Sequence, residues 1–90
     1  MKFEWDEKKA AENARKHHVT FDEGMTAFAD WGSITIPDPD HSEGEHRYLL
    51  IGMSSRQRIL VVSHAERGDN VRIINARRAN ARERKLYGGA

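Results

Sequence analysis

Three strand-like runs follow one another in the second half of the chain, and they constrain the fold more than any other feature. They are HRYLLIGMS (46–54), RILVVSHAE (58–66) and NVRIIN (70–75), and the first two are apolar on both faces near their middles. The connectors at Ser55-Arg56 and Arg67-Gly68-Asp69 are tight, as antiparallel hairpins require. The sequence therefore predicts an antiparallel β-meander over these three runs.

Helix signals dominate the first half of the chain. After a short strand-like alternation at residues 3–5, Asp6 is a good N-cap for the helix EKKAAENARKHH. Thr20 and Glu23 fit the capping box T-x-x-E of a second helix. The i, i+4, i+7 spacing predicts the buried side of that second helix, which is formed by Phe21, Met25 and Phe28.

The remaining segments complete one domain. Trp31-Gly32 ends the second helix, and SITI (33–36) is a short strand that PDPD stops. We expect Asn75 to cap a last helix, ARRANARERKLY (76–87), which Gly88-Gly89 terminates. The order β-α-α-β-β-β-β-α predicts a single α+β domain over residues 1–90. It would hold a small antiparallel β-sheet with two N-terminal helices and one C-terminal helix, the helices lying on one face.

Charge is divided unevenly along the chain. Residues 1–46 carry 11 acidic and 5 basic side chains, a net charge of −6, whereas residues 47–90 carry 3 acidic and 10 basic ones, a net charge of +7. Nine of those ten basic residues are arginine, the side chain suited to bidentate phosphate contact. The division indicates an anionic ligand, although an ordinary solvated helix face at the C-terminus would have the same composition.

Several classes of protein are disfavoured. Cysteine is absent, which excludes disulfides and thiolate metal sites and makes a reducing cytoplasm the natural compartment. The longest apolar stretches, YLLIGM and ILVV, are far too short to span a bilayer, and the N-terminus has no apolar signal region. The acidic stretch DPDHSEGEH (38–46) lacks the EF-hand pattern, so we expect neither a metal nor a cofactor.

Blocks of the sequence resemble the BrnT family. They are FEWDEKKAAENARKHHVTFDEG at the start, EHRYLLIG in the middle and HAERGDNVRIINARRANARERKLY at the end, and together they span residues 3–87. The most specific is RIINARRA-x-x-x-ER-x-x-Y, where the family more often has Ser at position 75. The resemblance implies a RelE-like ribonuclease toxin of a bacterial type II toxin–antitoxin system. It further implies cleavage of mRNA, inhibition of translation, the ribosome as a candidate partner, and neutralisation by a DNA-binding BrnA-type antitoxin, a ribbon-helix-helix protein.

The arginines suit such chemistry on physical grounds. Metal-independent RNA cleavage uses the 2′-OH as nucleophile, so the enzyme mainly positions the phosphate and stabilises its developing charge. We expect Arg72, at the end of the last strand, and Arg77 and Arg78, in the first turn of the last helix, to do so, because amide N–H groups also point there. Arg47 begins a neighbouring strand and can approach them. Further along the helix, Arg82, Arg84 and Lys85 are expected to bind the RNA backbone or the antitoxin.

Proton transfer needs a titratable group. His64 is the natural acid or base, since imidazole titrates near pH ~6.5. The alternative is a histidine at the edge of the core, hydrogen-bonded to Glu66 or to backbone. Glu66 is a weaker candidate for the base. Tyr87 is a second candidate in the RNA site, because RelE-like ribonucleases can use a tyrosine in place of histidines, and its alternative role is helix packing.

Two functional hypotheses follow. The preferred one is a metal-independent endoribonuclease toxin. The other is a non-catalytic module that binds nucleic acid or the antitoxin, such as a degenerate toxin. Trp5 and Trp31 are expected to anchor the core rather than to stack on bases.

Overall fold

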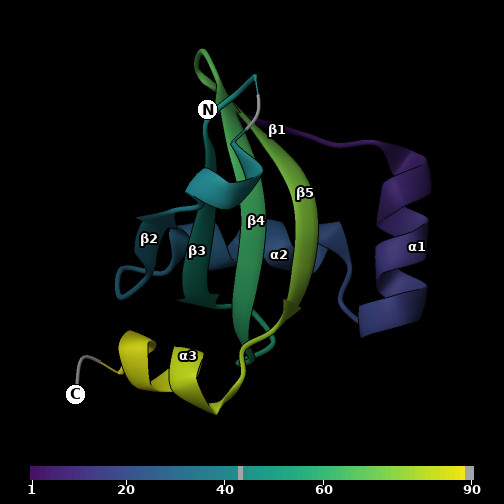
Figure 1. The fold of residues 1–90 in the computed structure, drawn as a ribbon. Helices are drawn as coiled ribbons and strands as arrows, with labels where there is room; N and C mark the ends of the chain where they lie inside the picture. The colour runs from purple at the N-terminus through teal and green to yellow at the C-terminus, as the bar shows by residue number, and fades with distance from the viewer. Residues whose placement is uncertain (43, 89–90) are drawn as a thin grey trace.

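The chain folds into a five-stranded sheet with helices against it (Figure 1). The computed structural model describes residues 1–42 and 44–88. In chain order the elements are β1 (Lys2–Glu4), α1 (Glu7–His17), α2 (Phe21–Thr26), the 3₁₀ helix η1 (Ala27–Ala29), β2 (Ile34–Pro37), the 3₁₀ helix η2 (Pro39–His41), β3 (Arg47–Met53), β4 (Ile59–Arg67), β5 (Asn70–Arg78) and α3 (Ala81–Tyr87). The predicted order of strands and helices and the α+β class are confirmed.

The sheet has the strand order β1-β5-β4-β3-β2. The β3–β4 and β4–β5 pairs are antiparallel, which confirms the predicted meander, and β2 pairs antiparallel with β3. The exception is β1, which pairs with β5 in parallel, so the sheet is mixed rather than wholly antiparallel. A parallel pair requires a long crossover, which the helices and the meander supply between the two strands.

One face of the sheet packs against α2 and η1 and forms the main core. Phe21 of α2 and Val62 of β4 are buried there, and Phe28 packs its ring edge against Phe3 at a centroid distance of 5.0 Å. The predicted inward side of the second helix is therefore confirmed. Trp5 also packs on this core, with its ring 5.9 Å from that of Phe21.

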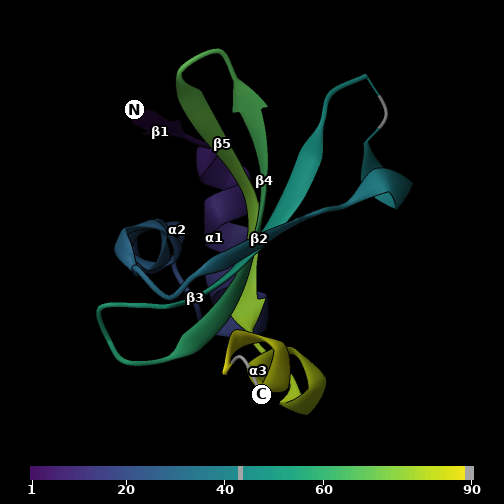
Figure 2. The same ribbon diagram turned by 90° about the vertical axis from the view of Figure 1, so that its left-hand side faces the viewer.

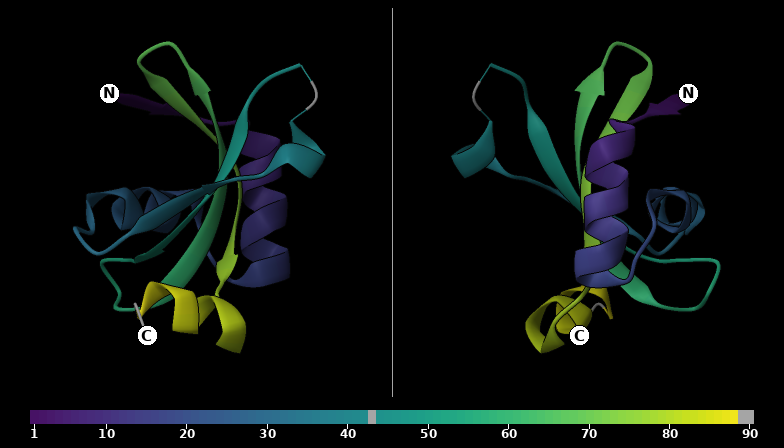
Figure 3. Two further views of the ribbon diagram at one scale, coloured as in Figure 1. Left: turned by 60° about the vertical axis from the view of Figure 1, so that its left-hand side comes forward. Right: turned by 90° about the vertical axis from the view of Figure 1, so that its right-hand side faces the viewer.

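Helix α1 lies beside β5 (Figure 3). Asn13 of α1 is buried against the strand, and its side chain makes two hydrogen bonds to the backbone of Ala76. The Oδ1 atom accepts from the Ala76 N–H at 3.1 Å, and Nδ2 donates to the Ala76 carbonyl at 2.7 Å. Because β1 covers only residues 70–72 of β5, Asn13 substitutes for the missing neighbouring strand at Ala76.

The last helix starts later than predicted. Strand β5 continues to Arg78, and Asn80, not Asn75, caps α3 through a full capping box with Glu83. Asn75 pairs with Ser63 inside the sheet. The strand pairing with β4 outcompetes an early helix start, since a local cap at Asn75 would give up ladder hydrogen bonds. Gly88 follows α3, and Gly89 lies outside the described residues.

Helix α3 packs on the opposite face from α2, so the expectation of helices on one face was wrong. A second core cluster forms there from Ile51, Val61 and Ala79, with Tyr87 packed against it. Figure 2 shows α2 to one side of the sheet and α3 at its lower end. No helix within residues 1–42 and 44–88 is long and apolar enough to cross a membrane.

Candidate nucleic-acid interface

The sheet divides the predicted catalytic residues between its two sides. We call the side opposite α2 the open face; its central side chains are Arg47, Leu49 and Ile51 of β3, Val61, Ser63 and Ala65 of β4, and Arg72, Asn75 and Arg77 of β5. Because neighbours along a strand alternate sides, His64 and Glu66 lie on the other side, which we call the helix face. The predicted set therefore does not form one site.

Arg47 and Arg72 are brought together on the open face. Both pair with Ala65, one from each side, so the two arginines lie in a single row across the sheet. Strands are spaced about 4.8 Å apart, which places their Cα atoms roughly 10 Å from each other. Two arginine side chains at that separation can reach a single phosphodiester between them. We call this the arginine row.

Among the residues that the structure describes, no acid holds either guanidinium of the arginine row tightly. The Nε atom of Arg47 is 3.6 Å from Glu45, beyond good hydrogen-bond distance, and it is buried without a hydrogen-bond partner among the described residues. Arg72 makes no ion pair with any residue that the structure describes. Buried polar groups normally have partners, so the arginine row is a good place for an anion.

Arg77 is occupied by an internal partner. Its guanidinium donates two hydrogen bonds of 2.8 Å to the carboxylate of Glu83, which forms the capping box of α3 with Asn80. This bond raises the pKa of Arg77 and holds the pKa of Glu83 below its usual value. Arg77 thus ties the end of β5 to the first turn of α3, and the prediction that it lies in that turn was wrong.

Arg78 is also in the strand rather than in the helix, contrary to the prediction. It pairs with Leu60, which places its exposed side chain at the end of the helix face. Arg78 is therefore separated from the arginine row by the thickness of the sheet.

His64 is a core residue. It is buried, its Nδ1 lies 3.1 Å from the Val62 carbonyl oxygen, and its ring packs 4.9 Å from Phe28 and 5.9 Å from Tyr48. Burial lowers the pKa of His64, which favours the neutral ring. The geometry matches the alternative of a backbone-bonded histidine. Glu66 is exposed on the same face.

The C-terminal residues differ among themselves. Arg82, Arg84 and Lys85 are exposed on α3, and Arg84 donates to the Ala79 carbonyl at 2.9 Å. Tyr87 donates its hydroxyl to Asp30 at 2.7 Å, and this bond raises the pKa of Tyr87. Tyr87 matches its alternative role in helix packing.

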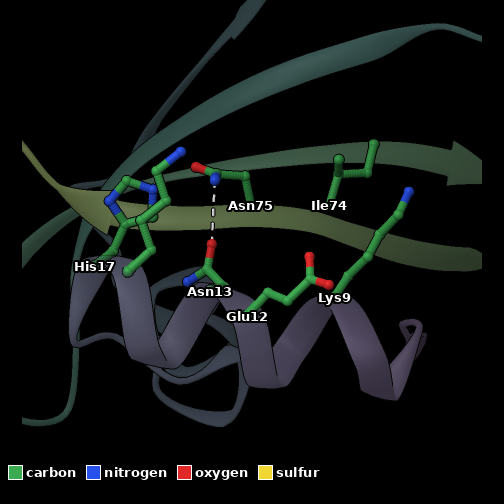
Figure 4. A pocket seen from close by; sticks show the side chains of 7 residues that line it. Lys9, Glu12, Asn13, His17, Ile74 and Asn75 are labelled. Atoms are coloured by element: carbon green, nitrogen blue, oxygen red, sulfur yellow. Dashed lines mark hydrogen bonds between the residues drawn. The ribbon is translucent and has the colours of Figure 1, made fainter.

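A groove between α1 and β5 was not found from the sequence. It has a volume of about 320 Å³ and is lined by Lys9, Glu12, Asn13, Lys16, His17, Ile74 and Asn75 (Figure 4). The i, i+7 spacing of Lys9 and Lys16 shows that they share a side of α1. Only the folded chain shows that this side meets β5.

Asn75 connects the groove to the open face. It lines the groove and donates to Asn13 at 3.1 Å, while its place in β5 puts it in the row next to the arginine row. The groove, with Lys9 and Lys16 on its α1 side, therefore adjoins the open face at Asn75.

The acidic stretch at 38–46 contains Glu43, which lies outside the described residues. His41 is 3.0 Å from Asp38 in that stretch. Within residues 1–42 and 44–88, no three His, Asp or Glu side chains are grouped so that they could hold a metal ion.

Comparisons with known proteins agree with this fold. The crystal structure of the Brucella abortus ribonuclease toxin BrnT matches with a TM-score of 0.70 and 24% sequence identity, covering 89% of this chain and 97% of the other. That likeness shows a shared fold. Among curated proteins no significant match was found. The family model described as "Ribonuclease toxin, BrnT, of type II toxin-antitoxin system" matches residues 5–83. Because this match spans most of the sequence, the chain belongs to the BrnT family of ribonuclease toxins.

Proposed function

We propose that this chain is an active endoribonuclease that cleaves mRNA and thereby inhibits translation. The observation that carries the proposal is the arginine row, in which Arg47 and Arg72 flank Ala65 on the open face. Two loosely held guanidinium groups at this spacing can contact both non-bridging oxygens of one phosphodiester. The site thus lies on the strands and not at the strand–helix junction.

The chemistry assigned to the arginine row is charge stabilisation. Attack of the RNA 2′-OH on the adjacent phosphate develops negative charge on the phosphate oxygens, and positioned guanidinium groups stabilise it. In this proposal the reaction needs no metal ion. The groove beside Asn75 holds the flanking backbone through Lys9 and Lys16, and backbone contacts of this kind contribute affinity rather than sequence preference.

The activity is tested with purified protein. Single-turnover cleavage of RNA in the presence of EDTA should proceed with the parental chain. Arg72→Ala and Arg47→Ala should each slow it by about 10²- to 10³-fold, the loss typical of a missing charge-stabilising donor. Arg78→Ala is the matched control, since it removes an exposed arginine from the same strand on the other side of the sheet, and it should cleave at close to the parental rate.

Growth provides the cellular test. Induced expression of the parental chain should arrest bacterial growth, and the Arg72→Ala variant should not. A soluble, folded parental chain that binds RNA but neither cleaves it nor arrests growth would support the non-catalytic module instead.

We further propose a BrnA-type ribbon-helix-helix antitoxin as the partner. A type II toxin has an antitoxin, and an acidic or amphipathic segment of that protein would complement the arginine-rich surface. Co-expression should restore growth. Binding should raise the melting temperature and weaken between 50 and 500 mM salt, because the distance over which exposed charges interact falls from roughly 14 Å to about 4 Å across that range. A salt-independent affinity would argue against charge complementarity.

A further inference from the structure

Trp31 departs from the rule that large aromatic residues are buried. Its side chain is fully exposed, at 103% relative exposure, so its expected role as a core anchor was wrong. The turn that carries it is nevertheless rigidly held. Asp30 accepts hydrogen bonds from the Gly32 N–H at 3.0 Å, the Met53 N–H at 2.7 Å and the Tyr87 hydroxyl at 2.7 Å. These bonds join the turn to β3 and α3 and present the indole to solvent in a fixed place.

The acidic side chains near this turn, Asp30 and Glu83, already have partners within the protein. Both oxygens of Asp30 accept hydrogen bonds within the protein, and the Tyr87 bond is the main cause of its lowered pKa. Glu83, the acidic residue of α3, is paired with Arg77. Arg82, Arg84 and Lys85 of the same helix are exposed. Among the described residues, an uncovered aromatic ring therefore stands beside a helix whose charges outside ion pairs are positive.

We propose that Trp31 is a stacking platform for a base of single-stranded RNA, with the backbone phosphates of that RNA held by the exposed cations of α3. Aromatic rings accept any base on their faces, and adjacent cations neutralise the phosphates, so the pair of features fits a single strand. A groove of about 370 Å³ lined by Thr26, Ala29, Asp30, Met53, Ser54 and Ser55 adjoins the turn and offers room for a neighbouring nucleotide.

This subsite rests on the proposed function and extends it away from the arginine row. Strand β3 runs from Arg47 to Met53, which is about 20 Å at the usual rise per residue. Met53 in turn bonds the Trp31 turn through Asp30. The RNA must therefore continue several nucleotides beyond the scissile phosphate, and Trp31 contributes to binding while remaining distant from the reacting atoms.

A protein partner would use the same region differently. Leu86 of α3 is 52% exposed, and an apolar segment of a partner would cover Leu86 together with Trp31. RNA would bind through the face of the indole and through the cations, and its affinity would not depend on Leu86. Leu86→Ala is therefore the matched control that separates the two occupants.

The test uses the full chain and a short labelled RNA carrying 2′-O-methyl riboses, which lacks the attacking hydroxyl and stays intact. By fluorescence anisotropy, Trp31→Ala should weaken binding on the order of tenfold, the effect of losing one stacked base, without changing the salt dependence. Arg82→Ala should instead lower the slope of log affinity against log salt by about one. Leu86→Ala should bind within about twofold of the parental chain.

A conservative variant gives a readout that folding alone does not change. Trp31→Phe should retain most of the affinity but lose the quenching of indole fluorescence that stacking on a base produces in the parental chain. An affinity of Trp31→Ala within twofold of the parental value overturns the inference while leaving the proposed ribonuclease intact. The inference is also overturned if Trp31→Ala and Leu86→Ala both weaken binding of the antitoxin and neither weakens binding of RNA. A parental chain that binds no RNA overturns both.

Discussion

Asn13 is the residue whose replacement should show most clearly how the fold is held together. Its buried side chain makes hydrogen bonds to three backbone groups of fully buried residues. They are the N–H and the carbonyl of Ala76 and, at 2.9 Å, the carbonyl of Val19. Leucine has the same number of non-hydrogen side-chain atoms and the same branching, but it can neither donate nor accept a hydrogen bond. Asn13→Leu therefore removes these three backbone hydrogen bonds, together with the one that Asn75 donates to Asn13.

The expected loss can be worked from those bonds. Each buried backbone group left without a partner costs about 1–3 kcal/mol. Burying the leucine side chain returns about 2 kcal/mol. Because the groove beside Asn13 lets water approach, we take the lower part of the range, and the net loss is about 3 kcal/mol. That is a large part of the ~5–15 kcal/mol that stabilises a typical domain.

Urea denaturation followed by circular dichroism measures this loss. With a slope of roughly 1.2 kcal/mol per molar urea for a small domain, the midpoint should fall by about 2 M or more. Asn80→Ala is the comparison, because it removes an exposed helix cap that is worth about 1 kcal/mol. A midpoint shift below about 0.5 M for Asn13→Leu would show that α1 does not depend on this residue for its place beside β5.

Three further changes test the internal contacts. Hydrogen bonds from Arg58 are the main cause that lowers the pKa of Glu23 below 4.5, so the parental chain should lose stability as the pH falls below about 4.5. Glu23→Gln should make stability less dependent on pH in denaturation measured between pH 3 and 7. The same change should cost about 2 kcal/mol of stability at pH 7. Burial lowers the pKa of His64 below 6.5, so the unfolded chain takes up the proton first and stability declines as the pH falls from about 6.5. His64→Phe should remove that decline. If the variant shows the same dependence of stability on pH as the parental chain, the prediction is contradicted. Arg77→Ala breaks the ion pair with Glu83 at the partly exposed end of β5, so it should lower stability by about 1 kcal/mol. The rate of single-turnover cleavage should stay nearly unchanged. A 100-fold slower rate in a folded variant would show that Arg77 takes part in the reaction.

The order and type of the elements could be predicted because their signals are local. Asp6 and Thr20 cap α1 and α2 as expected, since a cap needs only a side chain and the amides two or three residues ahead. The tight connectors likewise determine the antiparallel meander, because a short loop leaves no other way to return.

The placement of the site could not be predicted in the same way. Arg72 and Arg77 are five residues apart, which in a regular strand puts them on opposite sides of the sheet. The bulge at Ser63/His64, where β5 carries Ile74 as an extra residue, brings both to the open face. The end of β5 was misplaced for a related reason: the predicted cap was Asn75, but pairing with β4 extends the strand to Arg78 and leaves Asn80 to cap α3.

Burial of single polar and aromatic residues was also decided by tertiary contacts. Strand alternation puts His64 on the same side of β4 as Val62, but only the packing of Phe28 from η1 removes the imidazole from water. Trp31 has a large apolar side chain that is typical of a core residue, yet it is exposed to solvent. It lies in a turn that the hydrogen bonds of Asp30 to Met53 and Tyr87 hold at the surface. Local chemistry fixes what each segment becomes, since its partners are a few residues away. Which side chains meet water or each other depends on contacts between segments far apart in the chain, and those exist only after folding.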